Sequence, residues 1–347
     1  MTILYTSSKL FQRLERLITA LVVSCVAFAS ASTVQAQQLE KIRIGASSTS
    51  LVMLPMLLAD VDPRIFAKHG LQLEFQPLPG GNNCFAAVFS GASDVCMHGT
   101  TSGTDAVANG ADFQVIAVTT GPITEIILSQ KTATRLGVSA QDPIDKKLRA
   151  LKGLRVSVIG FHEVTLDAML KNLGMSVAND INVLKLSDPL TMMQSIRNDQ
   201  IDAAMWTIGS LGGVLADKSA IRFISIPRRD VAGFENLPTV SAFVPTPWYN
   251  AHKPQAVKIQ AAISDAIAQL KSDPAGSSKA VKAKYGAATP QDQWDDGYKQ
   301  ALLVLFDGAK ARRAPWDRLI QMQTASTKQN YANAAFDKLV APQARAD

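Results

Sequence analysis

The chain has 347 residues, of which 47% are hydrophobic and 18% are charged, and its formal net charge is +6 at pH 7. This composition is that of a globular protein with a large buried core, and the length favours two domains over one. The surplus of positive charge is diffuse and lacks runs of lysine or arginine, which excludes nucleic acid as the expected partner.

Residues 1–36 have the pattern of an export signal. A basic stretch over 9–16 precedes an apolar run over 17–29, and Val34-Gln35-Ala36 resembles a cleavage site. The apolar run is shorter than the roughly 20 residues that a membrane-spanning helix needs. We therefore expect a signal peptide over 1–36 that is removed from an exported protein.

The cysteines leave two questions open. Cys25 follows Val22-Val23-Ser24, a sequence that also suits lipoprotein cleavage, so lipidation at Cys25 is an alternative to cleavage after Ala36. Cys84 and Cys96 would form a disulfide in an oxidising compartment or remain two buried thiols. We favour the thiols because both positions have the apolar neighbours of a core.

The first part of the mature chain alternates strands with helices, which predicts a parallel sheet covered on both faces. Strands are expected over 42–45, 71–78, 94–98 and 113–119, and helices over 52–59, 63–68, 83–90 and 104–108. Thr49 or Ser50 is expected to cap the first of these helices.

A second alternating series follows an expected crossing strand over 125–130 and a polar interval. It has strands over 152–160, 182–186, 202–206 and 223–226 and helices over 164–173 and 189–198, the last capped by Asp188 with Pro189 in its first turn. After a strand over 239–244, the proline-rich stretch 245–248 suits a crossover. Helices over 254–271, 294–306 and 316–339 are expected to return to the first lobe. The fold class is thus α/β with two lobes.

Small polar residues follow the strands, where ligands bind in open parallel sheets. Each such loop alone is also what turns and helix caps are made of, but several loops on one edge favour a binding site. His162 is either a solvated loop residue or part of the site, and Trp206 is either a rim residue that stacks on a ligand or core. The candidate ligand-binding residues are Ser47, Ser48, Thr49, Ser50, Asn82, Asn83, Thr100, Thr101, Ser102, Thr119, His162, Thr165 and Trp206.

Signatures of catalysis are missing from the sequence. There is no GxSxG nucleophile elbow, no P-loop and no GxGxxG turn, and the histidines and cysteines form neither HxxxH nor CxxC. Cys96 and His98 fall on the same side of a strand, which we interpret as packing. We expect no catalytic residues, no cofactor and no metal site.

Four stretches together carry a resemblance. Ile42 to Ser50 (IRIGASSTS) opens the first lobe, Gly91-Ala92-Ser93-Asp94-Val95 precedes its third strand, Leu151 to Val156 (LKGLRV) opens the second lobe, and Asn198 to Ala204 (NDQIDAA) precedes Trp206. This order resembles the solute-binding proteins of ABC transporters of the nitrate, sulfonate and taurine type. The resemblance covers about 39–270.

The resemblance implies a type II periplasmic-binding-protein fold, with two α/β lobes joined by crossover strands near 125–130 and 239–244. Lobe 1 is expected over 37–128 and 244–347, and lobe 2 over 129–243. The resemblance further implies a monomeric, non-enzymatic periplasmic protein that captures a small organic solute between its lobes. The partners implied are this solute and an ABC permease with its ATPase.

The ligand expected from the resemblance is a sulfonate, a carboxylate or a related anion. Since the candidate residues include no Arg or Lys, hydroxyls, backbone N–H groups and helix N-termini would have to hold its charge. The same groups suit a neutral pyrimidine-type ligand, such as a thiamine precursor, stacked on Trp206 or Phe161. An enzyme of the related pyrimidine-precursor synthase type is the alternative from another class.

Overall fold

The structure, a computed structural model, describes residues 39–78 and 80–346. The expected signal peptide over 1–36 and the possible lipidation site at Cys25 lie outside the described residues. Two five-stranded sheets form the framework, in the orders β2-β1-β3-β10-β4 and β7-β6-β8-β5-β9. The strands are β1 (Glu40–Ala46), β2 (Leu71–Pro77), β3 (Val95–Gly99), β4 (Phe113–Thr120), β5 (Thr124–Ser129), β6 (Arg155–Ser157), β7 (Asn182–Leu184), β8 (Ala203–Thr207), β9 (Ala220–Ser225) and β10 (Val240–Pro245).

Each sheet contains one antiparallel strand among parallel ones: β10 pairs antiparallel with β3 and β4, and β5 pairs antiparallel with β8 and β9. These are the strands by which the chain enters each sheet from the other, after residues 121–123 and again after residues 226–239. The crossover strands predicted near 125–130 and 239–244 are therefore confirmed, and with them the two-sheet α/β fold. The lobe boundaries at 128/129 and 243/244 stay predictions.

The expectation of a crossover at 245–248 is wrong. Helix α12 (Thr246–Ala251) begins directly after β10 and contacts both β10 and β4 of the same sheet. Pro247 lies in its first turn, where a missing N–H group costs no helical hydrogen bond. The prolines therefore start a helix here and do not carry the chain to the other sheet.

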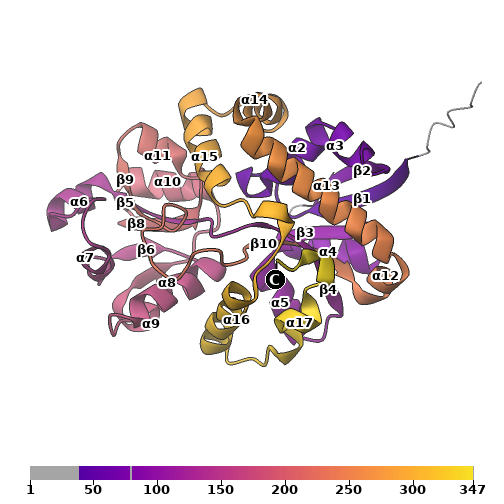
Figure 1. Ribbon diagram of the computed structural model, residues 1–347. Coiled ribbons are helices and arrows are strands. Elements are labelled where there is room, and N and C mark those ends of the chain that lie inside the picture. Colours follow the sequence, from indigo (N-terminus) through magenta and orange to yellow (C-terminus); the bar gives the residue numbers. More distant parts are fainter. Residues whose placement is uncertain (1–38, 79, 347) are drawn as a thin grey trace, which may run out of the picture. The chain divides into compact units, whose positions relative to one another are not determined.

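Helices follow most strands (Figure 1). The first sheet has α2 (Leu54–Val61), α3 (Arg64–Ala67), α4 (Gly81–Phe89) and α5 (Thr100–Ala108), and the second has α6 (Gln130–Leu136), α7 (Ile144–Arg149), α8 (Phe161–Lys171), α9 (Val177–Asp180), α10 (Pro189–Arg197) and α11 (Gly212–Ala216). The C-terminal part forms α12, α13 (Lys253–Ser272), α14 (Pro274–Tyr285), α15 (Gln291–Leu303), α16 (Arg313–Thr327) and α17 (Phe336–Leu339). Single 3₁₀ turns are η1 (Leu51–Met53), η2 (Asp307–Ala309), η3 (Ala332–Ala334) and η4 (Pro342–Ala344).

The C-terminal helices pack on the first sheet, as the sequence predicted. Ile259, Ile263 and Ile267 of α13 are buried in one core with Leu54 and Leu58 of α2, and Figure 1 shows α13 beside α2 and α3. Removal of such aliphatic side chains from water is the main force that holds this layer in place.

Two C-terminal helices also contact elements of the second sheet. Helix α15 buries Trp294 and Tyr298 in the core of the first sheet, while its Asp296 forms an ion pair with Arg222 of β9. Helix α16 contacts α8 on one side and α5 on the other. The two helices therefore link both halves of the fold.

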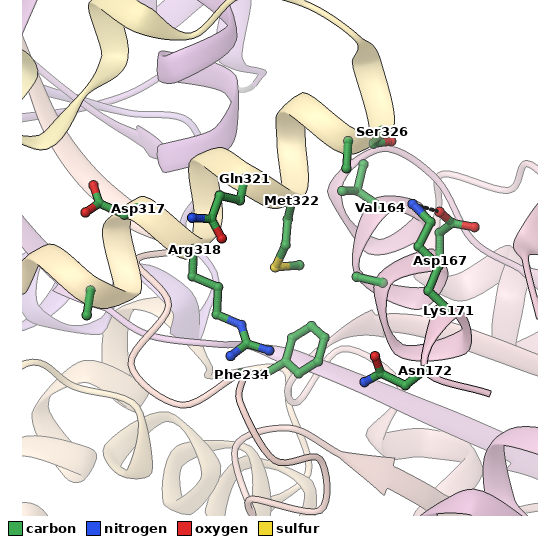
Figure 2. A pocket seen from close by; sticks show the side chains of 13 residues that line it. Val164, Asp167, Lys171, Asn172, Phe234, Asp317, Arg318, Gln321, Met322 and Ser326 are labelled. Atoms are coloured by element: carbon green, nitrogen blue, oxygen red, sulfur yellow. Dashed lines mark ion pairs between the residues drawn. The ribbon is translucent and has the colours of Figure 1, made fainter. Parts of the chain in front are cut away.

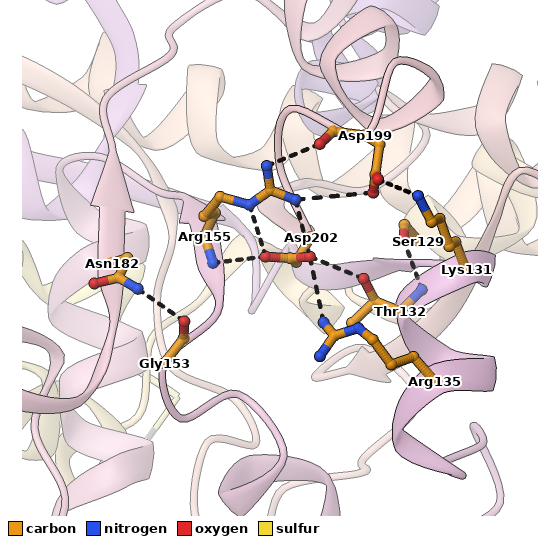
Figure 3. A network of polar contacts seen from close by, with 9 residues as sticks. All are labelled: Ser129, Lys131, Thr132, Arg135, Gly153, Arg155, Asn182, Asp199 and Asp202. Atoms are coloured by element: carbon orange, nitrogen blue, oxygen red, sulfur yellow. Dashed lines mark hydrogen bonds and ion pairs between the residues drawn. The ribbon is translucent and has the colours of Figure 1, made fainter.

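In each sheet, an arginine and an aspartate form the same set of hydrogen bonds between neighbouring strands. Arg43 of β1 donates its backbone N–H and its side chain to Asp94, and its Nη1 donates to the carbonyl of Gly91. Arg155 of β6 repeats each of these bonds with Asp202 and the carbonyl of Asp199 (Figure 3). Both aspartates lie just before a neighbouring parallel strand, so each contact fixes the start of one strand against the next.

Candidate functional site

The first part of the candidate site lies where β1 and β3 end. The backbone N–H of Ser47 donates to the carbonyl of Met97, and Oγ of Ser47 lies 2.7 Å from Nδ1 of His98. The ring of Phe85 meets the His98 ring edge to face at 5.2 Å. Burial lowers the pKa of His98 to about 4, so the imidazole is neutral at pH 7. His98, which we interpreted as packing, is thus a polar group at the end of its strand.

The rest of the serine-rich loop is more exposed. Oγ of Ser48 accepts the backbone N–H of Ser50 at 3.0 Å and donates to Oγ of Ser50 at 2.9 Å, while Thr49 is exposed. Ser50 does stand at the N-cap position, but its side chain makes no capping hydrogen bond. The helix also opens with the 3₁₀ turn η1 before α2 begins at Leu54. The predicted N-cap position of Ser50 is therefore confirmed, but its hydroxyl does not cap the helix.

Asn82 and Asn83 lie exposed in the first turn of α4, which begins at Gly81. The next residue, Cys84, forms a disulfide with Cys96 of β3, and their Cα atoms lie 5.5 Å apart. The preference for two buried thiols is therefore wrong, although both cysteines are fully buried as expected. The disulfide attaches the first turn of α4 to the strand that carries His98.

Thr100, Thr101 and Ser102 were expected in a loop, but they form the first turn of α5. Thr100 is fully buried, and its Oγ1 lies 2.8 Å from Oγ of Ser241 in β10. Thr101 and Ser102 are half-buried, and the carbonyl of Thr101 accepts a hydrogen bond from Gln323 of α16. The Thr100 hydroxyl is thus used in packing α5 on the sheet.

Thr119 lies at the end of β4, next to the first crossover. It is fully buried, and its Oγ1 lies 3.2 Å from Oγ1 of Thr120 and donates to the carbonyl of Val240. Oγ1 of Thr120 in turn donates to the carbonyl of Val52 at 3.0 Å. Both hydroxyls therefore connect the crossover to its surroundings.

The second part of the candidate site lies at the start of α8, which begins at Phe161, three residues before the helix that we expected over 164–173. His162 is only 8% exposed, and its Nδ1 lies 3.0 Å from Oγ1 of Thr124, the first residue of β5. Its ring lies 5.3 Å from that of Trp206, which is half-buried near the end of β8. Thr165 is buried and donates to the carbonyl of Phe161. The solvated-loop reading of His162 is therefore wrong.

The two histidines differ in their aromatic neighbours but share a lowered pKa and a hydroxyl partner. Burial lowers the pKa of His162 to about 4, as for His98. In each, Nδ1 is bonded to a hydroxyl, and within the described residues Nε2 forms no hydrogen bond. Each imidazole therefore keeps one neutral polar atom for another partner. Thr124 has no sequence motif that marks it, and it was missed.

Charge near the second part of the site is compensated. Glu163 follows His162 in α8, and its carboxylate lies 3.5 Å from Nζ of Lys185. In the part of the chain that the structure describes, no three His, Cys, Asp or Glu side chains are grouped so that they could bind a metal ion. Nor does any helix of residues 39–78 and 80–346 have the length and hydrophobicity to span a bilayer.

Two cavities lie along α8, and neither is lined by His98 or His162. One of about 620 Å³ separates α8 from α16 (Figure 2), and one of about 560 Å³ is lined by Gly160, Glu163 and Lys185 among others. None of the predicted site residues, all of which the structure describes, lines either cavity.

The family model described as NMT1/THI5 like matches residues 64–277. A comparison with curated protein sequences finds no match. Among solved structures, the periplasmic aliphatic sulphonate-binding protein SsuA of Escherichia coli is similar with a TM-score of 0.67 and 16% identity, covering 83% of this chain and 92% of its own.

Two further solved structures are similar. SsuA of Xanthomonas axonopodis pv. citri, bound to MOPS, has a TM-score of 0.61 and 18% identity over 88% of this chain and 95% of its own. The periplasmic nitrate-binding protein NrtA of Synechocystis PCC 6803 has a TM-score of 0.54 and 14% identity over 76% of this chain and 69% of its own. The chain therefore belongs to the NMT1/THI5-like family and has the fold of the periplasmic sulfonate- and nitrate-binding proteins, as its sequence predicted.

Proposed function

We propose that the protein is the periplasmic solute-binding component of an ABC importer, which captures a small organic solute at the strand ends of its two sheets and delivers it to a permease. The observation that carries this proposal is the matched pair His98 and His162. Each is neutral, is bonded through Nδ1 to a hydroxyl, and keeps Nε2 without a protein partner in the described chain. His98 stands near the end of a first-sheet strand, and His162 lies in the first turn of α8 beside the second sheet.

The ligand that we propose is a sulfonate, a carboxylate or a related anion. Helices α5 and α8 begin beside the two histidines in sequence, and each helix N-terminus acts as about half a positive charge. An imidazole N–H and the half-buried Thr101 and Ser102 would add neutral donors. The sulfonate-binding neighbours support this choice. The candidate residues named from the sequence remain proposals as ligand contacts.

A neutral pyrimidine-type ligand is the second candidate, and Trp206 is the observation that favours it. Its half-buried ring lies next to the neutral imidazole of His162, an arrangement on which a flat heterocycle could stack. We prefer a binding role to that of a pyrimidine-precursor synthase because the similar solved structures are named as binding proteins.

The test is a melting-temperature screen of the mature protein against methanesulfonate, taurine, benzoate, nitrate and a hydroxymethylpyrimidine. A ligand present at 100 times its Kd stabilises the folded state by about 2.7 kcal/mol, which is a shift of several degrees. We expect the sulfonates or the carboxylate to raise the Tm most. A rise with the pyrimidine alone would select the second candidate, and no rise with any of the five would contradict the proposed ligand classes.

A further inference from the structure

The cavity of about 620 Å³ is built from three stretches that are far apart in the sequence. Helix α8 contributes Val164 and Lys171, the segment between β9 and β10 contributes Phe234, and α16 contributes Arg318 and Met322 (Figure 2). Its volume falls within the range of small-molecule sites. Six of the thirteen lining residues are apolar, Phe234 and Met322 being the largest, and four are charged.

Arg318 has no carboxylate partner among the described residues. Its guanidinium lies over the ring of Phe234, 5.8 Å from the centroid. Gly233 makes this position possible, because a Cβ atom there would lie 2.5 Å from Nη2 of Arg318. Figure 2 shows Arg318 directed into the cavity and the neighbouring Asp317 directed away from it.

Two of the other three charged residues of the lining, Lys171 and Asp167, neutralise each other, and the third, Asp317, is the one directed away from the cavity (Figure 2). Nζ of Lys171 lies 2.9 Å from Oδ2 of Asp167, and Oδ1 of Asp167 also accepts the backbone N–H of Val177. The side chains directed into the cavity therefore leave one uncompensated positive charge, that of Arg318. An anion would supply the missing partner.

Other features of the lining suit an anion with an apolar body. Ala314 belongs to the first turn of the 15-residue helix α16, whose N-terminus favours negative charge. The carboxamides of Asn172 and Gln321 add N–H donors. Met322 is half-buried and flexible, so it can adapt to the shape of a ring.

We propose that this cavity, the α8–α16 site, is a second binding site for a small organic monoanion with an aromatic or similar apolar body, and that Arg318 binds its carboxylate or sulfonate group. The site is separate from the strand ends because none of the predicted strand-end residues lines it. It goes beyond the proposed transport function, which uses the strand ends.

The experiment is ¹⁹F NMR titration of the mature protein with 4-fluorobenzenesulfonate, with uncharged 4-fluorobenzyl alcohol as the reference probe. We expect saturable binding of the sulfonate and at least 10-fold weaker binding of the alcohol. Arg318→Gln should weaken sulfonate binding about 10- to 100-fold, since a hydrogen bond to a charged group contributes about 1.5–3 kcal/mol. Arg312→Gln removes the same charge from an exposed residue just before α16 and should change the affinity less than 3-fold.

Two further variants distinguish binding at the α8–α16 site from binding at the strand ends. Ala325→Glu places a negative charge in the lining at an exposed position and should also weaken binding at least 10-fold. Trp206→Ala changes the strand-end site and should leave this binding unchanged. The α8–α16 site is overturned if Arg318→Gln and Ala325→Glu bind the sulfonate as the wild type does, or if Trp206→Ala alone abolishes binding. The latter result would instead support a sulfonate site at the strand ends.

Discussion

Nδ1 of His162 lies 3.0 Å from Oγ1 of Thr124, so the first turn of α8 is bonded to the residue at which the chain enters the second sheet. Both side chains are buried. The bond fixes the imidazole next to Trp206 and ties its orientation to the first crossover. A movement of the crossover would therefore displace the His162 side chain through this bond.

Thr124→Val should destabilise the protein and weaken solute binding together. The change keeps the shape of the side chain but leaves Nδ1 of His162 buried without a partner, which costs roughly 1–3 kcal/mol. Urea unfolding measures this loss, and the Tm screen measures the binding. Thr134→Val, at an exposed position of α6, is the control and should change stability by less than about 0.5 kcal/mol. Equal effects of the two variants would contradict the role of Thr124.

The protein should lose stability as the pH falls from about 6.5 to about 4. His98 and His162 have pKa values of about 4 in the folded protein and about 6.5 in the unfolded chain, so the unfolded state binds more protons in this window. The stabilisation is complete above pH 6.5 and is lost as the pH approaches 4. Melting curves of the wild type and of His98→Gln/His162→Gln measure the effect. If the stability of the double variant declined equally steeply with pH, the pH dependence would come from groups other than these two histidines.

The Cys84–Cys96 disulfide should contribute about 3 kcal/mol to the free energy of unfolding, the value expected for a loop of this length. We expect Cys84→Ala/Cys96→Ala to unfold at a correspondingly lower urea concentration. Alkylation of the denatured, unreduced mature protein should label neither cysteine, as read by mass spectrometry. Labelling of both thiols would restore the interpretation that we first favoured.

Arg222→Gln should lower the free energy of unfolding more than the paired change Glu125→Gln/Arg222→Gln does. Nε of Arg222 lies 2.6 Å from Oε1 of Glu125, which is 4% exposed, and burial raises the pKa of Glu125. Removal of the arginine leaves the buried Glu125 carboxylate without a charged partner and with only the Ser225 hydroxyl bonded to it among the described residues, at a cost of about 3–5 kcal/mol.

The control for this ion pair is Asp296→Asn. Asp296 lies at the more exposed end of the network and pairs with both Arg222 and Arg228. Its replacement should cost about 1 kcal/mol or less. If the double variant were as unstable as Arg222→Gln, the cost would lie in packing and not in the unpaired carboxylate.

The sequence predicted the strands well and the starts of helices less well. Strands such as β4 are apolar runs bounded by polar residues, so their pattern is visible. Helices α5 and α8 begin with Thr100 and Phe161 directly after glycines, and their first turns lack apolar periodicity. Helix α14 was not predicted because Ser277 and Val281 are its only buried residues, which is too narrow an apolar face to give a signal.

The candidate site was predicted as a set of loops but not as a set of contacts. The position of Ser47 at a strand end was foreseen, but its bond to His98 depends on the register of β1 with β3. The bond of His162 to Thr124 likewise joins residues 38 positions apart. The disulfide could not be inferred because the spacing of two cysteines does not reveal the distance between them.

The paired contacts Arg43–Asp94 and Arg155–Asp202 each fix one end of a sheet. Within the described chain, the opposite end of each sheet has no such contact with these residues, so its side chains can be substituted without loss of this attachment. Both contacts lie where β3 and β8 begin, whereas His98 and Trp206 lie where these strands finish. Hydrogen bonds from Arg155 lower the pKa of Asp202 to about 2, against the opposing effect of burial, so this attachment persists in acid. Because the anchors and the candidate site occupy opposite ends of the same strands, the proposed solute preference can diverge by substitution at one end while the other continues to specify the fold.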